Sequence, residues 1–149
     1  MRILRVLSVL SLVMVLGACS CRTRKVGPGD ENVPVAGEAS PIRDVNFAFD
    51  SYVIDATAKS VLQVNADWLS KNPAVKVQAE GHCDERGTNE YNMALGAKRA
   101  QAAIEVLRSL GIAADRLSSI SYGEELPLDP AHNEAAWAKN RRDHFKTVQ

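Results

Sequence analysis

The feature that most constrains the fold is a strand that leads through a polar loop into a long helix. Residues 75–80 alternate between apolar and polar side chains, as a half-buried strand does. A polar segment follows at residues 81–87, and a helix is expected from Thr88 or Asn89 to Leu110. Side chains from the strand end, the loop and the first helical turns should therefore lie close together.

The rest of the chain supplies partners for this unit. Strands alternate with helices, and the second helix shows a core face at Met93, Ala97, Ala100, Ile104 and Leu107, with Arg99 one residue off it. This order predicts an α+β fold, a two-layer sandwich of a mixed β-sheet with helices on one face. The further expected elements are a strand at 45–50 with Val45, Phe47 and Phe49 on one face, a helix capped by Asp55 and ending near Asn72-Pro73, a strand at 117–122, a short helix at 134–140 and a strand at 141–148.

Four residues around the loop suggest a binding site. Asp84 lies in the loop, and Asn92, Leu95 and Arg99 follow at helical spacings that place them on one stripe. A carboxylate accepts hydrogen bonds from an ammonium group, and an arginine can hold a carboxylate through two parallel donors. The set therefore suits a ligand that carries both an amine and a carboxylate.

Simpler interpretations of these residues remain open. Asp84 could be a carboxylate favoured by the helix dipole, and Arg99 a surface charge that covers apolar neighbours. The two could also form an internal ion pair. Arg141 and Arg142 are expected to be solvated or paired with nearby carboxylates, with a place at the pocket rim as the alternative.

The N-terminus has the pattern of an export signal. Two arginines and an apolar run precede Cys19, so residues 1–18 are interpreted as a signal peptide. Residues 16–19 resemble the lipobox of bacterial lipoproteins, in which the cysteine is lipidated, and Ser20 points by that resemblance to the outer membrane. Residues 19–44 are then a lipidated, flexible linker rich in Pro and Gly, and residues 45–149 a folded domain.

Several other classes of function are disfavoured. The chain has 18 Lys and Arg against 18 Asp and Glu, so no charge excess argues for nucleic acid. The run His82-Cys83-Asp84 lacks the spacing of a metal site, and no nucleophile with its base and orienting group can be identified. We expect no cofactor, no metal, no catalytic residue and no Cys21–Cys83 disulfide.

Longer motifs give the most specific indication. With Gly81–Thr88, Tyr91-Asn92, Arg99-Ala100, Ser121–Glu124 and Ala138–Arg142 in order, the sequence resembles the OmpA-like peptidoglycan-binding domain family, and most closely its lipoprotein members. The resemblance spans about residues 43 to 149. Cys83 departs from it, because alanine is usual there and the thiol could make binding sensitive to oxidation, and so does Asp143-His144-Phe145 in place of a more aliphatic strand start.

The resemblance implies a non-enzymatic function. It implies non-covalent binding of the meso-diaminopimelate of peptidoglycan stem peptides by Asp84 and Arg99, with Asn92, Leu95 and Asp50 completing the site. It also implies a tether between outer membrane and cell wall, with the periplasmic propeller protein TolB and other Tol proteins as partners. The alternatives are a module that chiefly binds TolB and, more remotely, a periplasmic hydrolase.

Overall fold

The structure, a computed structural model, describes residues 42–148. The expected signal peptide, the lipidated Cys19 and nearly all of the linker lie outside these residues. The described elements are β1 (Val45–Asn46), α1 (Ala56–Lys71), β2 (Lys76–His82), α2 (Asn89–Ser109), a 3-10 turn η1 (Ala114–Arg116), β3 (Leu117–Gly123), α3 (Glu134–Asn140) and β4 (Arg142–Val148).

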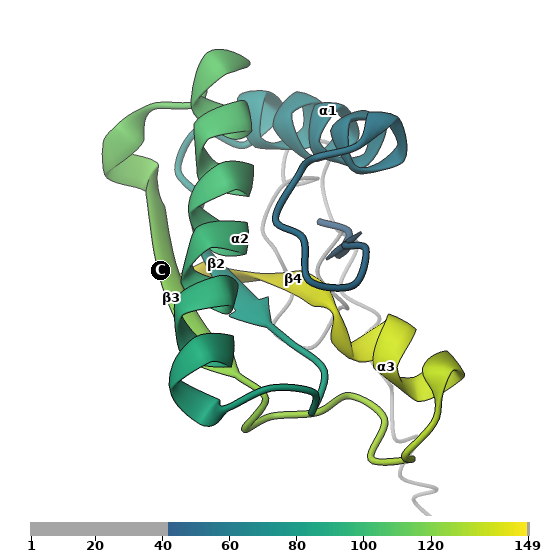
Figure 1. Cartoon of the computed structure of the whole chain (residues 1–149). Helices are drawn as coiled ribbons and strands as arrows, with labels where there is room; N and C mark the ends of the chain where they lie inside the picture. The colour runs from purple at the N-terminus through teal and green to yellow at the C-terminus, as the bar shows by residue number, and fades with distance from the viewer. Residues whose placement is uncertain (1–41, 149) are drawn as a thin grey trace, which may run out of the picture. The chain divides into compact units, whose positions relative to one another are not determined.

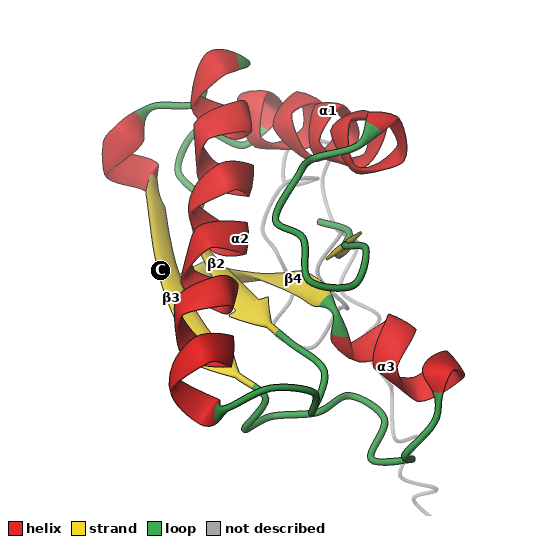
Figure 2. Cartoon of the chain, in the orientation of Figure 1, coloured by secondary structure: helices red, strands yellow, loops and turns green. Residues whose placement is uncertain are grey.

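The strands form one mixed sheet in the order β1-β4-β2-β3 (Figures 1 and 2). Strands β2 and β3 are parallel, and α2 makes the crossover that such a pair requires. Strand β4, the last in sequence, lies between β1 and β2 and is antiparallel to both. The predicted α+β sandwich with a mixed sheet is confirmed. The register that the sequence left uncertain places Asp143 opposite Val45 and Gly81.

Local sequence signals explain where the helices begin. The Asp55 carboxylate accepts from the backbone N–H of Ala58 at 2.7 Å, and the Thr88 hydroxyl accepts from that of Tyr91 at 3.2 Å. Both caps agree with the predicted helix starts. Between residues 42 and 148, no helix combines the length and the apolar character that crossing a membrane requires.

The buried face of helix α2 agrees only in part with the one expected. Ala100, Ile104 and Leu107 are buried as predicted, but Ala97 is exposed and Arg99 is fully buried. The cause is a backbone contact between β2 and α2: a Cβ on Gly81 would lie only 2.0 Å from the carbonyl oxygen of Gly96. This contact turns the stripe beside Gly96 toward the sheet, so the prediction that Arg99 lies off the core face is wrong.

The first strand is shorter than predicted. Only Val45 and Asn46 pair with β4, and the chain then turns, with Asp50 at a left-handed φ of 50°. Val45 and Phe47 are buried as expected, but Phe49 is 55% exposed. The turn redirects Phe49 away from the core and, with Asp50, toward the site described below.

The folded part also begins earlier than the predicted boundary at residue 45. Ile42 belongs to the hydrophobic core, and the backbone of Arg43 exchanges two hydrogen bonds with the buried side chain of Asn65. Asp44 contacts His144 at 2.8 Å. The three residues assigned to the end of the linker are therefore part of the domain.

Candidate functional site

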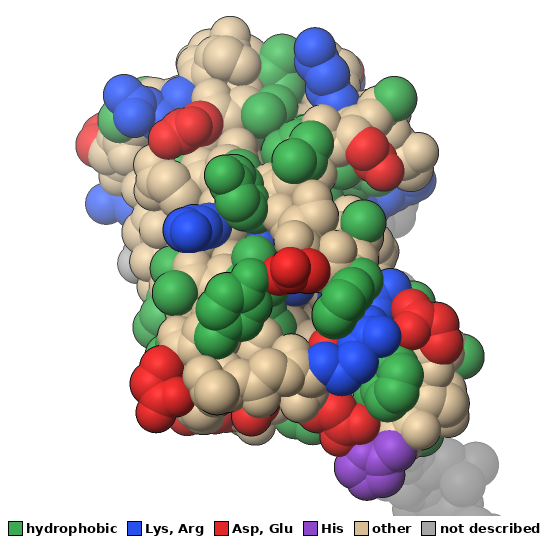
Figure 3. Space-filling model, viewed as in Figure 1, with side chains coloured by type: hydrophobic (Ala, Val, Ile, Leu, Met, Phe, Trp, Pro, Cys, Tyr) green, Lys and Arg blue, Asp and Glu red, His purple; other side chains and the backbone are tan. Residues whose placement is uncertain are grey.

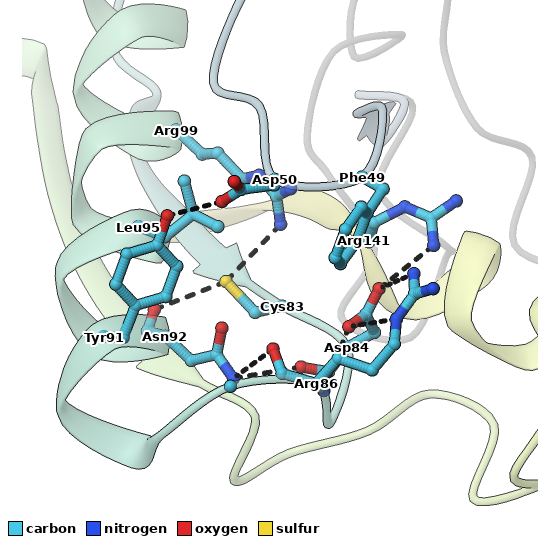
Figure 4. Close-up of a pocket in the computed structure, with 11 residues that line it drawn as sticks. Phe49, Asp50, Cys83, Asp84, Arg86, Tyr91, Asn92, Leu95, Arg99 and Arg141 are labelled. Carbon is cyan, nitrogen blue, oxygen red and sulfur yellow. Dashed lines mark hydrogen bonds and ion pairs between the residues drawn. The ribbon is translucent and has the colours of Figure 1, made fainter.

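One pocket brings together all five residues that the sequence singled out in the folded domain. Its volume is about 220 Å³, and it opens between the turn after β1, the loop after β2 and the first half of α2 (Figure 4). The residues that line it are Phe49, Asp50, Cys83, Asp84, Arg86, Gly87, Tyr91, Asn92, Leu95, Arg99 and Arg141.

Arg99 forms one end of the pocket and is fixed there by backbone carbonyl groups. Its side chain is fully buried. Nε donates to the carbonyl of Ser51 at 2.7 Å, Nη1 to that of His82 at 2.8 Å and Nη2 to that of Ala48 at 3.1 Å. Burial lowers the pKa of Arg99, but a guanidinium stays charged at neutral pH. The pocket therefore holds a permanent, rigid cation.

Asp84 forms the opposite end and pairs with two other arginines. Its Oδ2 accepts from Arg86 Nη2 at 2.7 Å and from Arg141 Nη1 at 3.0 Å. The alternative of an internal Asp84–Arg99 ion pair is therefore wrong in this structure. Burial raises the pKa of the Asp84 carboxyl, but hydrogen bonds from Arg86 and Arg141 outweigh this effect, and the net shift is downward. Asp84 is thus an ionised carboxylate at neutral pH.

The two arginines also share a second acidic partner. Glu134 accepts from Arg141 at 2.9 Å and lies 3.3 Å from Arg86, so Asp84, Arg86, Glu134 and Arg141 form a closed ring of ion pairs. Figure 3 shows basic and acidic side chains next to one another on this face, with hydrophobic side chains between them. Arg141 is buried and paired with carboxylates rather than solvated. For Arg141, this confirms the expected pairing with nearby carboxylates.

The ring of ion pairs includes Arg86, whose role the sequence did not reveal. The guanidinium of Arg86 stacks on the Phe49 ring at 3.9 Å and on the Trp137 ring at 4.4 Å. Phe49 and Trp137 come from distant parts of the chain. The only sequence signal was the position of Arg86 two residues after Asp84 in a loop, where a turn allows such side chains to meet.

Asn92 braces the loop. Its amide nitrogen donates to the backbone carbonyls of Asp84 at 3.2 Å and Arg86 at 3.3 Å, and it also bonds to the Glu124 carboxylate. The side-chain oxygen of Asn92 is the atom left to meet a ligand. Asn92 therefore contributes chiefly by holding Asp84 and Arg86 in place.

Asp50, which lies in the turn after β1 and not in the strand, lines the pocket as well. Its exposed carboxylate accepts a hydrogen bond from the Tyr91 hydroxyl group. Leu95, 8% exposed, provides an apolar wall beside them. Two carboxylates and three guanidinium groups thus line one small cavity.

Cys83 is a free, buried thiol inside the pocket wall. It donates to the carbonyl of Asn92 at 3.3 Å and accepts from Arg99 Nη1 at 3.4 Å. Burial raises the pKa of Cys83 to about 11, which keeps the thiol protonated and unreactive at neutral pH. The suggested sensitivity to oxidation therefore has little chemical basis.

Two further polar side chains near the site are buried without hydrogen-bond partners among the described residues. Both carboxyl oxygens of Asp143 are unpaired, and burial raises the pKa of Asp143 well above its ordinary value. Both ring nitrogens of His82 are unpaired, and burial lowers its pKa to about 4, while its ring stacks on Tyr122. The His82 ring is therefore neutral at pH 7, and burial favours the protonated form of the Asp143 carboxyl group.

The arrangement suits recognition of a small charged end group. The cavity is smaller than the roughly 300 to 1,000 Å³ of typical sites for whole small-molecule ligands. Arg99 and Asp84 lie at opposite ends of it in Figure 4. One end can accept a carboxylate and the other an ammonium group. Within residues 42–148, no cluster of three His, Cys, Asp or Glu side chains could hold a metal ion.

Comparison with known proteins agrees with this geometry. Residues 46–141 match the OmpA family. The chain is 40% identical to the peptidoglycan-associated lipoprotein of Pasteurella multocida over 95% of each chain. It is 38% identical to that of Agrobacterium fabrum over 91% of this chain and 84% of the other.

Solved structures show the same fold. The crystal structure of the peptidoglycan-associated lipoprotein from Burkholderia pseudomallei matches with a TM-score of 0.69 and 40% identity, over 71% of this chain and 90% of that one. The C-terminal domain of Helicobacter pylori MotB matches with a TM-score of 0.68 at 24% identity, over 72% and 85%, which is a likeness of fold alone. The chain therefore belongs to the OmpA family, and its sequence relatives within that family are peptidoglycan-associated lipoproteins.

Proposed function

We propose that the protein binds peptidoglycan without covalent attachment by holding the free end of meso-diaminopimelate in stem peptides. The observation that carries this proposal is the pocket in which ionised Asp84 and permanently charged Arg99 occupy opposite ends. The free end of diaminopimelate bears one ammonium and one carboxylate group on the same carbon. Both charges can be matched in a cavity of this size.

Each predicted site residue has a role in this proposal. Arg99 receives the ligand carboxylate, and its carbonyl partners hold the guanidinium so that little rotamer entropy is lost on binding. Asp84 receives the ammonium group, with Asp50 as a second carboxylate at the pocket mouth. Leu95 covers the ligand's methylene carbons, and Asn92 keeps the loop in position.

In the cell, this pocket would act as the distal end of a tether. Lipidation at Cys19 would hold the chain on the outer membrane, facing the periplasm, and the linker would let the domain reach the wall. Attachment through many molecules to a repeating polymer makes weak single-site binding effective. The names of the relatives from Pasteurella multocida and Agrobacterium fabrum support this assignment. A role in envelope integrity and cell division within the Tol–Pal system, with TolB as a partner, belongs to the same proposal.

Two alternatives lead to different outcomes. A module that chiefly binds TolB would show little affinity for purified wall, and a periplasmic hydrolase would release soluble muropeptides from it. The protein as proposed is not an enzyme and leaves the wall intact.

The decisive experiment is co-sedimentation of the purified chain in detergent with sacculi, in the presence of a soluble competitor. Free meso-diaminopimelate should displace the protein, whereas 1,5-diaminopentane, which has both amines but no carboxylate, should not. Loss of the contact between Arg99 and the ligand carboxylate should cost about 1.5 to 3 kcal/mol, or roughly ten- to a hundredfold in affinity. Equal competition by the two compounds would refute the assignment of Arg99 to the ligand carboxylate.

Protein variants complete this test. Asp84→Asn, which keeps the side-chain shape, should reduce sedimentation, while Arg108→Gln on the exposed side of α2 should not change it. For the anchor, Cys19→Ala should move the protein from the membrane fraction to the soluble fraction. Retention of Cys19→Ala on the membrane would contradict lipidation at this residue.

A further inference from the structure

We propose that Arg86 is a built-in competitor for the ligand: its guanidinium occupies the place on Asp84 that a ligand ammonium group needs, and it must swing aside before the pocket is complete. This inference rests on the proposed function and adds a mobile residue that controls access to one end of the site. Figure 4 shows the guanidinium of Arg86 directly against the carboxylate of Asp84.

The acceptor capacity of Asp84 is already used. A carboxylate offers about four lone-pair sites. Oδ1 accepts from the backbone N–H of Arg86 at 3.1 Å and from its Nε at 3.2 Å, and Oδ2 accepts from Arg86 Nη2 at 2.7 Å and Arg141 Nη1 at 3.0 Å. An incoming ammonium group can reach Asp84 only if a guanidinium leaves.

Arg86 is the one that can leave. The side chain of Arg141 is 8% exposed, and its Nε donates to the carbonyl of Phe47 at 3.1 Å, so moving it would break contacts inside the fold. The side chain of Arg86 is 31% exposed and belongs to a loop. Arg141 thus stays as the fixed partner of Asp84, whereas Arg86 can leave Asp84 and become solvated.

Glu134 lowers the cost of this movement. It already lies 3.3 Å from Arg86, and its side chain is 62% exposed. When Arg86 leaves Asp84, it can keep an acidic partner at the surface, so no charge is left unpaired. What is lost is the stacking of the guanidinium between Phe49 and Trp137 and the bidentate contact with Asp84.

This arrangement has a consequence for affinity. If the binding-competent state is only a fraction of the population, the apparent dissociation constant is raised by the inverse of that fraction. An apolar side chain of similar length at position 86 removes the competing guanidinium and keeps Arg141 and the backbone N–H of residue 86 as partners of Asp84. Affinity should therefore increase when this arginine is removed, although the substitution deletes a charged group from the pocket.

The test is calorimetric titration of the purified chain in detergent with free meso-diaminopimelate. Arg86→Met should bind about three- to tenfold more tightly than the wild type, and Arg86→Lys, which keeps the charge but loses the fork, should lie between them. Arg108→Met, a substitution of the same chemistry on an exposed part of α2, should bind like the wild type. Equal or weaker binding by Arg86→Met would overturn the proposal.

A spectroscopic signal follows the movement itself. Trp137 contacts the guanidinium of Arg86, so ligand binding should change its fluorescence, and this change should be absent in Arg86→Met. Trp137→Phe, which leaves Trp68 as the other tryptophan, assigns the signal. If the wild type bound the ligand and its Trp137 fluorescence changed no more than that of Arg86→Met, displacement of Arg86 would be contradicted.

The outcomes separate this inference from the proposed function. If the wild type binds diaminopimelate and Asp84→Asn does not, but Arg86→Met gives no gain, only the competitor role is wrong. If neither the wild type nor Arg86→Met binds, the proposed function and the inference built on it both fail.

Discussion

Replacing Arg99 by methionine should lower the free energy of unfolding of the domain substantially, and it should also abolish ligand binding. Arg99 is fully buried and holds the carbonyl groups of Ala48, Ser51 and His82, which come from the turn after β1 and from β2. It therefore joins two segments that no regular strand pairing connects at this point. Arg99→Met keeps most of the side-chain volume and removes every donor.

The expected magnitude follows from these three bonds. A typical hydrogen bond contributes about 1 kcal/mol net to stability. Hydrogen bonds from a charged donor, such as these three from Arg99, contribute more, about 1.5 to 3 kcal/mol. Removing a buried cation offsets part of the loss. We expect a net loss of about 3 kcal/mol, a large share of the roughly 5 to 15 kcal/mol that stabilises a domain. This corresponds to a decrease in Tm of about 12 to 24 °C.

Urea unfolding followed by far-UV circular dichroism measures this effect. Arg108→Met, on the exposed side of the same helix, should stay within about 0.5 kcal/mol of the wild type. If Arg99→Met were as stable as Arg108→Met, the carbonyl contacts would not support the fold. The result also decides how binding is tested, because a variant that loses Arg99 can fail to bind through loss of folding alone.

Three other perturbations probe the surroundings of the site. Gly81→Ala should lower the free energy of unfolding by about 3 kcal/mol or more, measured by urea unfolding, because its Cβ would lie 2.0 Å from the Gly96 carbonyl oxygen; a loss below about 1 kcal/mol would contradict that close contact. In a Cys21→Ser variant of the lipidated chain, Cys83 should react with Ellman's reagent at pH 7.5 only as fast as the protein unfolds, since its pKa is raised to about 11; fast labelling of this native variant would argue against a buried thiol. Asp143 has a raised pKa in the folded state, so its contribution to stability is present below about pH 4 and is lost as the pH rises. The stability of Asp143→Asn relative to the wild type should therefore increase with pH above about 4 in parallel urea titrations, and a constant difference would mean that the carboxyl is not perturbed.

The structural features predicted most accurately from the sequence are those that depend on residues close together in the chain. The caps at Asp55 and Thr88 determine where α1 and α2 begin, and both act within three residues. The stripe of Asn92, Leu95 and Arg99 follows from helical geometry alone. The order of the elements was enough to predict the mixed sheet, and local spacing brought Asp84, Asn92, Leu95 and Arg99 together, whereas Asp50 was assigned to the site only through the family resemblance.

Features that depend on distant contacts were not predictable in the same way. The burial of Arg99 follows from the contact between Gly81 and Gly96, which turns α2 against the sheet. The first strand ends early because its partner β4 begins only at Arg142, almost a hundred positions later and directly after α3. The pairing of Asp84 with Arg141 requires the position of β4 between β1 and β2, which no periodicity reveals.

Under the proposed function, with Arg86 as the proposed competitor, the two ends of the pocket differ in mobility as well as in charge. Arg99 is held by carbonyl groups inside the fold, so the carboxylate end of a ligand meets a guanidinium that is already in position. Asp84 is available only after Arg86 moves, so the ammonium end meets a site that is already occupied. A ligand with only one of the two charges gains from only one end, since a carboxylate alone leaves Arg86 in place and an amine alone has to displace it without help from Arg99. The proposal therefore predicts that a zwitterionic end group binds better than either charge alone, because displacement of Arg86 would be driven by a group that Arg99 has already anchored.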